Sequence, residues 1–476
     1  MKLWGRFGPI NLLWSFIVVG IVKHNKKARG SRPQAPKSAV EEVEIHALSH
    51  EAQGVSRSQD KVMFIPGTLP GETVKVQVDK EMRHFNHGKL IELVSVSNER
   101  VEPFCPHFKR CGACQLQHLA SDKQLGYKQQ NLHEQLTRQL KLNDIPWQAP
   151  IESEPFNYRR RARLGVRYRK QQDEIIVGFR EEANKHLAAI KACPVLQPSL
   201  SELITPLQVL ISQLVSKSRI TQLELIASDD TDVAVLRHLK KMEAQDVKKL
   251  KKWAQAKNIQ LFLQGDEDEG LTCLWPEEAA PLSYEVQGND LHFNVKNFIQ
   301  GNKEVNKKML AQAQNWLAAK PHETLLDLFA GIGNFSVPMA QQFKQVVAVE
   351  GISDMVKQID HNSALNKQDN VQAMMLNLAD EVLLQKLPKT DAILLDPPRT
   401  GAAELMPWLS RQKSRILYVA CEPSSLVRDA KVLLEAGFKL DKICVMDMFP
   451  QTKHVESMAL FVKDSGHRVR KGLGEV

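Results

Sequence analysis

The alternation of hydrophobic and polar residues divides the chain into a β-rich first part, a mixed middle and a regular α/β last part. Between residues 43 and 94, short runs alternate with period two and are separated by Gly/Pro turns, such as Pro-Gly-Thr-Leu-Pro-Gly-Glu at 66–72. This pattern predicts a small five-stranded antiparallel β-barrel of the oligonucleotide-binding (OB) type. A structural SH3-like cap fits the same pattern.

The second half of the chain predicts a different architecture. From residue 291 on, seven strand-like hydrophobic runs occur, the first several separated by helical segments. This order predicts a doubly wound, mostly parallel, Rossmann-like α/β sheet. Residues 196–290 mix helical and strand-like runs, which predicts a mixed α/β layer between the two parts.

Composition and charge narrow the class of protein. The chain has 476 residues, of which 43% are hydrophobic and 25% charged. These values fit a folded globular protein and argue against disulfide-rich mini-proteins, collagen and polytopic membrane proteins. The formal net charge is +9, and seven basic residues lie between Arg159 and Lys170. Such density on predicted strands favours contact with RNA phosphates over a merely solvated surface.

The first 38 residues form a hydrophobic and basic extension that we expect to be disordered. Its apolar run, residues 10–22, has 13 residues, fewer than the ~20 that a membrane-spanning helix needs. Residues 1–21 are interpreted as a translation-start artefact or a dispensable extension. An anchor at a membrane surface is the alternative.

A glycine-rich loop follows the first strand of the predicted parallel sheet. The segment from Asp327 to Phe335 reads Asp-Leu-Phe-Ala-Gly-Ile-Gly-Asn-Phe, and Glu350 ends the next strand 23 residues after Asp327. A dinucleotide site would have a third glycine where Ser336 stands. The acidic strand end and the second acid instead resemble the S-adenosylmethionine site of class I methyltransferases.

Two further strand ends indicate the chemistry. Asp396-Pro-Pro-Arg399 has arginine where methyltransferases acting on amino groups carry an aromatic residue, which disfavours a nitrogen target. Methylating carbon 5 of uracil requires covalent activation, and Cys421, at the next strand end, is placed for this role. A helix predicted to open at Ser424 would lower the pKa of its thiol. The alternative role for Cys421 is core packing.

The proposed reaction also needs a base to remove the proton from carbon 5. Glu456, immediately before the last strand, is the candidate, and His454 is the second candidate. Glu456 could also be a solvated loop carboxylate.

Four of the seven cysteines form a separate set. Cys105, Cys111 and Cys114 lie within ten residues of one another, and 78 residues separate Cys114 from Cys193. Three close cysteines and a distant fourth suit a [4Fe–4S] cluster or a zinc ion, and the spacing leaves both open.

Taken together, these motifs resemble the TRAM-domain, iron–sulfur RNA uracil-5-methyltransferases, most closely those acting on bacterial 23S ribosomal RNA. The resemblance covers residues 40–465 and rests on FIPGTLPGE, CGAC, YRRRAR, DLFAGIGNF, DPPRTGA, YVACEP and FPQTKHVES. It implies that Cys421 is the nucleophile and Glu456 the base. It also implies that the four cysteines bind a [4Fe–4S] cluster and that S-adenosylmethionine lies against Gln300, Phe329, Asn334, Glu350, Asn377 and Asp396.

The same resemblance implies a domain organisation and a setting. We expect an extension at 1–38, a TRAM barrel at 39–100, a cluster-bearing region at 101–290 and a methyltransferase domain at 291–476. A cytoplasmic monomer without a stable protein partner is expected. The rivals are a transfer-RNA enzyme, whose relatives lack the barrel and the cysteines, and a non-catalytic RNA-binding assembly factor. One departure from the family is Glu422, which replaces the usual asparagine after the nucleophile.

Overall fold

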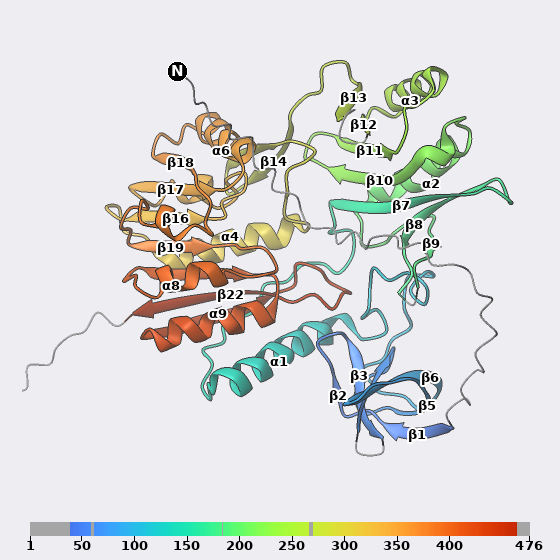
Figure 1. The fold of residues 1–476 in the computed structure, drawn as a ribbon, viewed down its shortest axis with the longest axis horizontal. Coiled ribbons are helices and arrows are strands. Elements are labelled where there is room, and N and C mark those ends of the chain that lie inside the picture. Colours follow the sequence, from blue (N-terminus) through green and yellow to red (C-terminus); the bar gives the residue numbers. More distant parts are fainter. Residues whose placement is uncertain (1–38, 59–60, 183, 266–269, 464–476) are drawn as a thin grey trace, which may run out of the picture. The chain divides into compact units, whose positions relative to one another are not determined.

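The structure is a computed structural model that describes residues 39–463 except 59–60, 183 and 266–269. The extension expected at 1–38 therefore lies outside the described residues, and both of its interpretations stay predictions. The strands of the described part of the chain form three large sheets and one two-stranded hairpin (Figure 1).

The first sheet is the predicted barrel. Its strand order is β1-β5-β6-β4-β3-β2. Inward positions such as Met63, Ile65, Val74 and Val76 are fully buried, as the period-two alternation requires. The sheet has six strands instead of the expected five, because the short β2 pairs with β3. It is also not wholly antiparallel as predicted, since β4 and β6 pair in parallel. The strands are β1 (Val40–Glu44), β2 (Ala47–Leu48), β3 (Gln53–Ser58), β4 (Lys61–Pro66), β5 (Thr73–Glu81) and β6 (Phe85–Ser95).

The second sheet lies in the middle of the chain and has the order β13-β12-β11-β10-β7-β8-β9. On β7, Ala162, Leu164 and Val166 are buried, while the intervening arginines point to the other face. Helix α2 packs against β8 and β10, and α3 packs against β12 and β13. The elements are α1 (Ser121–Leu140), β7 (Arg161–Arg169), β8 (Glu174–Arg180), β9 (Leu187–Ala189), α2 (Pro198–Ser212), the 3₁₀ helix η1 (Lys217–Arg219), β10 (Ile220–Ala227), β11 (Asp232–His238), α3 (Ala244–Lys257), β12 (Gln260–Gln264) and β13 (Leu271–Trp275).

The third sheet is the doubly wound one. Its order is β18-β17-β16-β19-β20-β22-β21; the first five strands run parallel, and β22 is antiparallel to both of its neighbours. This part comprises α4 (Lys303–Leu317), β16 (Thr324–Leu328), α5 (Ser336–Met339), β17 (Gln345–Glu350), α6 (Ser353–Leu365), β18 (Val371–Met375), α7 (Glu381–Leu384), β19 (Ala392–Leu395), η2 (Ala403–Leu405), α8 (Met406–Leu409), β20 (Arg415–Ala420), α9 (Pro423–Glu435), β21 (Phe438–Met446) and β22 (Glu456–Lys463). The carboxyl ends of β16, β17, β19 and β20 meet at one edge.

Two elements connect the middle of the chain to this sheet. Helix α1 packs against α9 and β21, and Figure 1 shows it beside α9. The hairpin of β14 (Leu282–Val286) and β15 (Asn289–Phe293) contributes Tyr284 to the core that also contains β16 and β19 residues. The domain boundary expected between residues 290 and 291 falls inside this hairpin.

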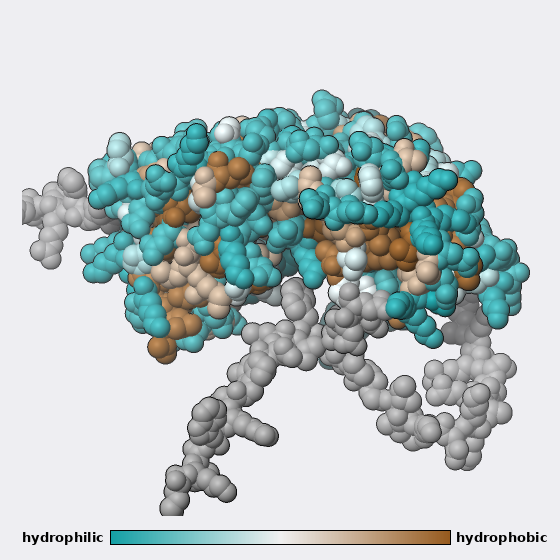
Figure 2. All heavy atoms as spheres, turned by 90° about the horizontal axis from the view of Figure 1, so that it is seen from above, coloured by the Kyte–Doolittle hydropathy of each residue, from teal (hydrophilic) through white to brown (hydrophobic). Residues whose placement is uncertain are grey.

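The face drawn in Figure 2 is mostly hydrophilic. Figure 2 shows polar side chains covering most of the drawn face, with hydrophobic ones in separate patches. Among the described residues, the helices include none with the length and hydrophobicity required to cross a membrane.

Candidate active site

The glycine-rich loop begins directly at the end of β16. Phe329 has a φ of 65°, which side-chain-bearing residues rarely adopt, and Gly331 and Gly333 have φ of 59° and 91°. This tight path brings the loop against Glu350 at the end of β17. The amide of Gly331 donates to Glu350 Oε2 at 3.0 Å, and the amide of Gly351 donates to Oε1 at 2.8 Å.

A hollow of about 850 Å³ opens beside this loop. Three of the six side chains predicted to bind the methyl donor line it, namely Phe329, Glu350 and Asn377. Its other side is formed by Pro398 of the Asp-Pro-Pro-Arg motif and by the residues that follow the motif, from Thr400 to Leu405. The hollow therefore lies at the carboxyl edge of the sheet, where ligands of doubly wound folds bind.

The other three predicted residues lie elsewhere around the loop. Gln300 Nε2 donates to Asp396 Oδ2 at 3.3 Å, so these two form one polar pair. The amide side chain of Asn334 exchanges two hydrogen bonds with Asn306, each 3.0 Å long, and accepts a third from the Tyr284 hydroxyl. These hydrogen bonds connect the Asn334 side chain to Asn306 and Tyr284. Its contact with the methyl donor stays a prediction.

The carboxyl groups of Asp327, Glu350 and Asp396 lie close enough to one another to interact electrostatically. Burial, together with the nearby Asp396 and Glu350, raises the pKa of Asp327 to about 7. Ser336 Oγ donates to Asp327 Oδ2, while the buried Oδ1 has no hydrogen-bond partner among the described residues. Burial also raises the pKa of Asp396 to about 7. A cluster of this kind favours a positively charged ligand, such as a sulfonium.

The predicted nucleophile and base are brought together at the same edge. Cys421 follows β20 directly, Glu456 is the first residue of β22, and β20 pairs with β22. Burial raises the pKa of the Glu456 carboxyl to about 8; Asp396 contributes to this rise, and Arg399 opposes it. A buried carboxyl with a pKa near neutrality suits proton transfer, so Glu456 is not a solvated loop residue.

The pKa of the Cys421 thiol differs from the value that the sequence predicts. Burial, followed by the charges of Glu456 and Asp396, raises the pKa of Cys421 to about 12, and Arg399 only partly opposes this. The prediction that the start of α9 lowers this pKa is therefore wrong, because burial and two carboxylates outweigh the helix terminus. Glu422 is not among the groups that shift it; its Oε1 accepts from the Ser424 hydroxyl at 3.2 Å.

His454, the second candidate for the base, lies two residues before Glu456. Burial and surrounding cations, first of all Arg399, lower the pKa of His454 to about 4. The ring is therefore neutral near pH 7. It could accept a proton only weakly, which favours Glu456 as the base.

Sequence reasoning missed Lys128 in α1. Its side chain is 3% exposed, and its ammonium lies 2.7 Å from Asp447 Oδ1 and 3.1 Å from the Phe449 carbonyl oxygen. Its charge also acts on Glu456. A usable signal existed, since Lys128 shares the apolar stripe of α1 with Leu125 and Leu132.

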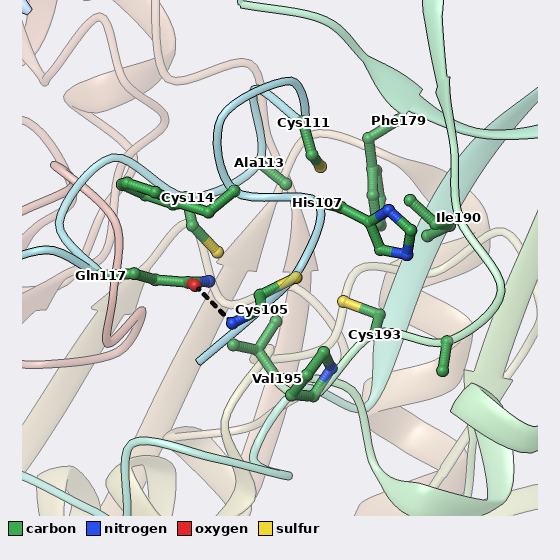
Figure 3. A pocket seen from close by; sticks show the side chains of 13 residues that line it. Cys105, His107, Cys111, Ala113, Cys114, Gln117, Phe179, Ile190, Cys193 and Val195 are labelled. Carbon is green, nitrogen blue, oxygen red and sulfur yellow. Dashed lines mark hydrogen bonds between the residues drawn. The ribbon is translucent and has the colours of Figure 1, made fainter. Parts of the chain in front are cut away.

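The four cysteines of the predicted ligand set face one small cavity. Figure 3 shows the sulfur atoms of Cys105, Cys111, Cys114 and Cys193 directed toward a common space that His107 and Phe179 also line. Burial raises the pKa of Cys111 to about 11 and that of Cys114 to about 12. In the described part of the chain, no three His, Cys, Asp or Glu side chains are placed as a metal-ion site.

The basic strand β7 is only partly available to RNA. Arg160, which precedes it, is 1% exposed and stacks on Tyr284 at 4.3 Å, and Arg161 pairs with Glu224 at 2.8 Å. Two of the seven basic residues of the predicted RNA contact, Arg160 and Arg161, are therefore already engaged within the protein. The exposed members are Arg163, Arg167, Arg169 and Lys170.

Comparison with known proteins identifies the family. The profile described as tRNA (Uracil-5-)-methyltransferase matches residues 120–464, and that of the TRAM domain matches residues 37–91. Relatives named 23S rRNA (uracil(1939)-C(5))-methyltransferase RlmD are 43% identical in Shewanella sediminis and 41% in Pectobacterium atrosepticum. These matches cover 91% and 90% of this chain, and 99% and 94% of the relatives.

A solved structure supports the same fold. The Pyrococcus abyssi tRNA (uracil-54, C5)-methyltransferase with bound S-adenosyl-L-homocysteine is 21% identical, has a TM-score of 0.70, and covers 88% of this chain and 99% of its own. The predicted TRAM domain and Rossmann-like methyltransferase fold are thus confirmed. The chain therefore belongs to the family described as tRNA (uracil-5-)-methyltransferase, whose members are S-adenosylmethionine-dependent RNA methyltransferases.

Proposed function

We propose that this protein methylates carbon 5 of a uridine in 23S ribosomal RNA through a covalent adduct between Cys421 and carbon 6 of the base. One observation carries the proposal. The Cys421 thiol, the Glu456 carboxyl and the Asp396 carboxyl are electrostatic neighbours at the sheet edge where the hollow for the methyl donor opens.

The adduct explains why both a thiol and a base are needed. Addition of the Cys421 sulfur to carbon 6 makes carbon 5 nucleophilic enough to take the methyl group from the sulfonium. Carbon 5 then carries both the methyl group and its original proton. Glu456 accepts that proton, the carbon–sulfur bond breaks with its electrons returning to Cys421, and the double bond between carbons 5 and 6 is restored.

The high pKa of Cys421 is compatible with this order of events. Burial and the two neighbouring carboxyl groups, Glu456 and Asp396, keep the thiol protonated in the free enzyme. A bound sulfonium offsets their charge, so thiolate forms more easily once the methyl donor is present. Such coupling would keep the nucleophile inactive until the methyl donor is bound.

The RNA class is proposed from the relatives. Those quoted above are named for uracil 1939 of 23S ribosomal RNA, and the TRAM barrel and the exposed arginines of β7 suit an RNA backbone. Such a substrate implies a cytoplasmic location.

The substrate can be tested in a strain lacking this gene. Mass-spectrometric mapping should find one unmethylated uridine at the position equivalent to 1939 in 23S ribosomal RNA, with 5-methyluridine in transfer RNA unchanged. Loss of 5-methyluridine from transfer RNA alone would refute the ribosomal substrate.

We expect proton removal to depend on pH through Glu456. Its pKa is raised to about 8, and below that value the protonated carboxyl cannot accept the carbon 5 proton. Single-turnover tritium release from 5-tritiated uridine RNA should therefore rise with pH through about 8, and the methylated adduct should persist at lower pH. Release that is flat between about pH 6 and pH 9 would contradict this role.

We also propose that Cys105, Cys111, Cys114 and Cys193 bind a [4Fe–4S] cluster. The donor set fits: four thiols face one small cavity, with no acidic side chain in its lining. When bound, the cluster would be ligated by the four thiolates and would connect the loop of residues 105–114 to Cys193. None of the proposed reaction steps moves an electron, so we assign the four ligands a structural role.

The cluster proposal predicts a coloured protein with a defined iron content. Protein purified without oxygen should be brown and hold about four iron atoms per chain. Cys193→Ala should lower the iron content, whereas Cys273→Ala, at a half-buried cysteine of β13, should leave it unchanged. A colourless protein with stoichiometric zinc would refute the assignment.

A further inference from the structure

We propose that Gln124 is a positioning residue that holds the general base in place, an inference that rests on the function proposed above. Its buried amide joins two parts of the chain. One is the cysteine segment, residues 105–119, and the other is the base loop, residues 447–455, which runs from the end of β21 to Glu456.

Both polar atoms of the Gln124 side chain form hydrogen bonds. It lies in the first turn of α1 and is 1% exposed. Its Nε2 donates to the Leu116 carbonyl at 3.1 Å, to the Leu119 carbonyl at 3.0 Å and to Gln451 Oε1 at 2.9 Å. Its Oε1 accepts a hydrogen bond from the backbone N–H of Gln451 at 2.9 Å. Since a buried amide keeps its geometry when all its groups are satisfied, Gln124 fixes the spacing between the two parts.

Gln451, which is hydrogen-bonded to Gln124, has an unfavourable backbone conformation that these contacts stabilise. Its φ is 70°, a left-handed conformation that residues other than glycine seldom adopt. Its carbonyl oxygen accepts from the amides of Gln115 and Leu116, both at 3.0 Å, and its Nε2 donates to Ser121 Oγ at 3.0 Å. Contacts from the cysteine segment and from α1 therefore hold the loop in a shape that it would not keep alone.

Other residues of the base loop also form hydrogen bonds with preceding segments of the chain. The Tyr158 hydroxyl donates to the Pro450 carbonyl at 2.9 Å, and Lys128 donates to the Phe449 carbonyl. The amide of Lys453 donates to Gln115 Oε1 at 3.3 Å. Because Glu456 begins the strand directly after this loop, a shift of the loop moves the carboxyl relative to the Cys421 adduct.

This arrangement predicts a specific defect. Loss of the Gln124 bonds should slow proton removal, which needs Glu456, more than methyl transfer, which does not. The methylated adduct should then accumulate, because it forms normally and is resolved slowly. A purely structural role would instead lower both steps together, in proportion to the folded protein that remains.

Two variants and a matched control test the proposal. Gln124→Met keeps the side-chain volume and removes all four bonds, whereas Gln451→Gly suits the positive φ and removes only the side-chain bonds. Gln130→Met is the control, because Gln130 is exposed on the same helix and its side chain donates to Glu134 on the helix surface. Single-turnover assays would measure tritium release, methylated adduct on denaturing gels, KM for S-adenosylmethionine and the thermal midpoint of each protein.

We expect Gln124→Met and Gln451→Gly to slow tritium release by about 10- to 100-fold and to accumulate methylated adduct, with KM unchanged. Gln130→Met should match the wild type. Release equal to that of the control, or slowed release without adduct in a folded protein, would overturn the positioning role. Cys421→Ala in the same assay separates the two proposals: if it releases tritium at the wild-type rate, the covalent function itself is wrong.

Discussion

Replacing Cys421 with alanine is expected to abolish methylation while leaving the fold intact. The side chain is only partly buried, and it lies at the end of β20, outside the tightly packed centre of the sheet. Without the sulfur, carbon 5 of uracil stays a poor nucleophile, so the rate should fall by roughly 10⁴-fold or more. Tritium release from 5-tritiated uridine RNA measures this loss directly.

The matched control for that experiment is Cys273→Ala. Both changes remove one partly buried thiol, but Cys273 lies in β13 of the middle sheet. It should retain wild-type release and wild-type affinity for S-adenosylmethionine. Substantial activity in Cys421→Ala would show that no thiol adduct is formed at this position.

Glu456→Gln is expected to stop the reaction one step later. The amide is nearly the same size as the carboxyl but cannot accept the proton from carbon 5. Turnover should fall by about 10²- to 10⁴-fold, the usual contribution of a positioned base. The methyl group should still be transferred, so a methylated protein–RNA adduct should accumulate and survive denaturing electrophoresis.

His454→Gln distinguishes the two candidate bases. Its ring is neutral near pH 7, because its pKa is lowered to about 4, and it lies next to the same site. We expect this variant to resolve the adduct, at a rate within about tenfold of the wild type. If His454→Gln traps the adduct and Glu456→Gln does not, the base is the histidine.

Much of this fold could be predicted from local sequence. The strand ends that carry Asp327, Glu350, Asp396 and Cys421 all lie where hydrophobic periodicity predicts them. These elements have long, regular patterns, and in a parallel sheet the order of strands and helices dictates which strand ends meet. The candidate site was accessible from sequence for that reason.

What the sequence could not supply depends on contacts between distant segments. The pKa of Cys421 is raised rather than lowered, because the thiol is buried and because Glu456 and Asp396 approach it from other parts of the sheet. Arg160 is buried in a basic run that predicts exposure, because Tyr284 of β14 stacks on it. Gln124 and Gln451 are 327 residues apart, and no local pattern links them. Such pairings are known only once the chain is folded.

The central claim is that Cys421 forms a covalent bond to the target uridine, and trapping with 5-fluorouridine RNA tests it most directly. Fluorine at carbon 5 cannot be removed as a proton, so the methylated adduct cannot be resolved. After digestion with trypsin and nuclease, mass spectrometry should place one methylated fluorouridine on the peptide of residues 416–428, at Cys421. Attachment at any other residue, or 5-methyluridine formation on ordinary RNA with no adduct on the fluorinated one, would contradict the claim.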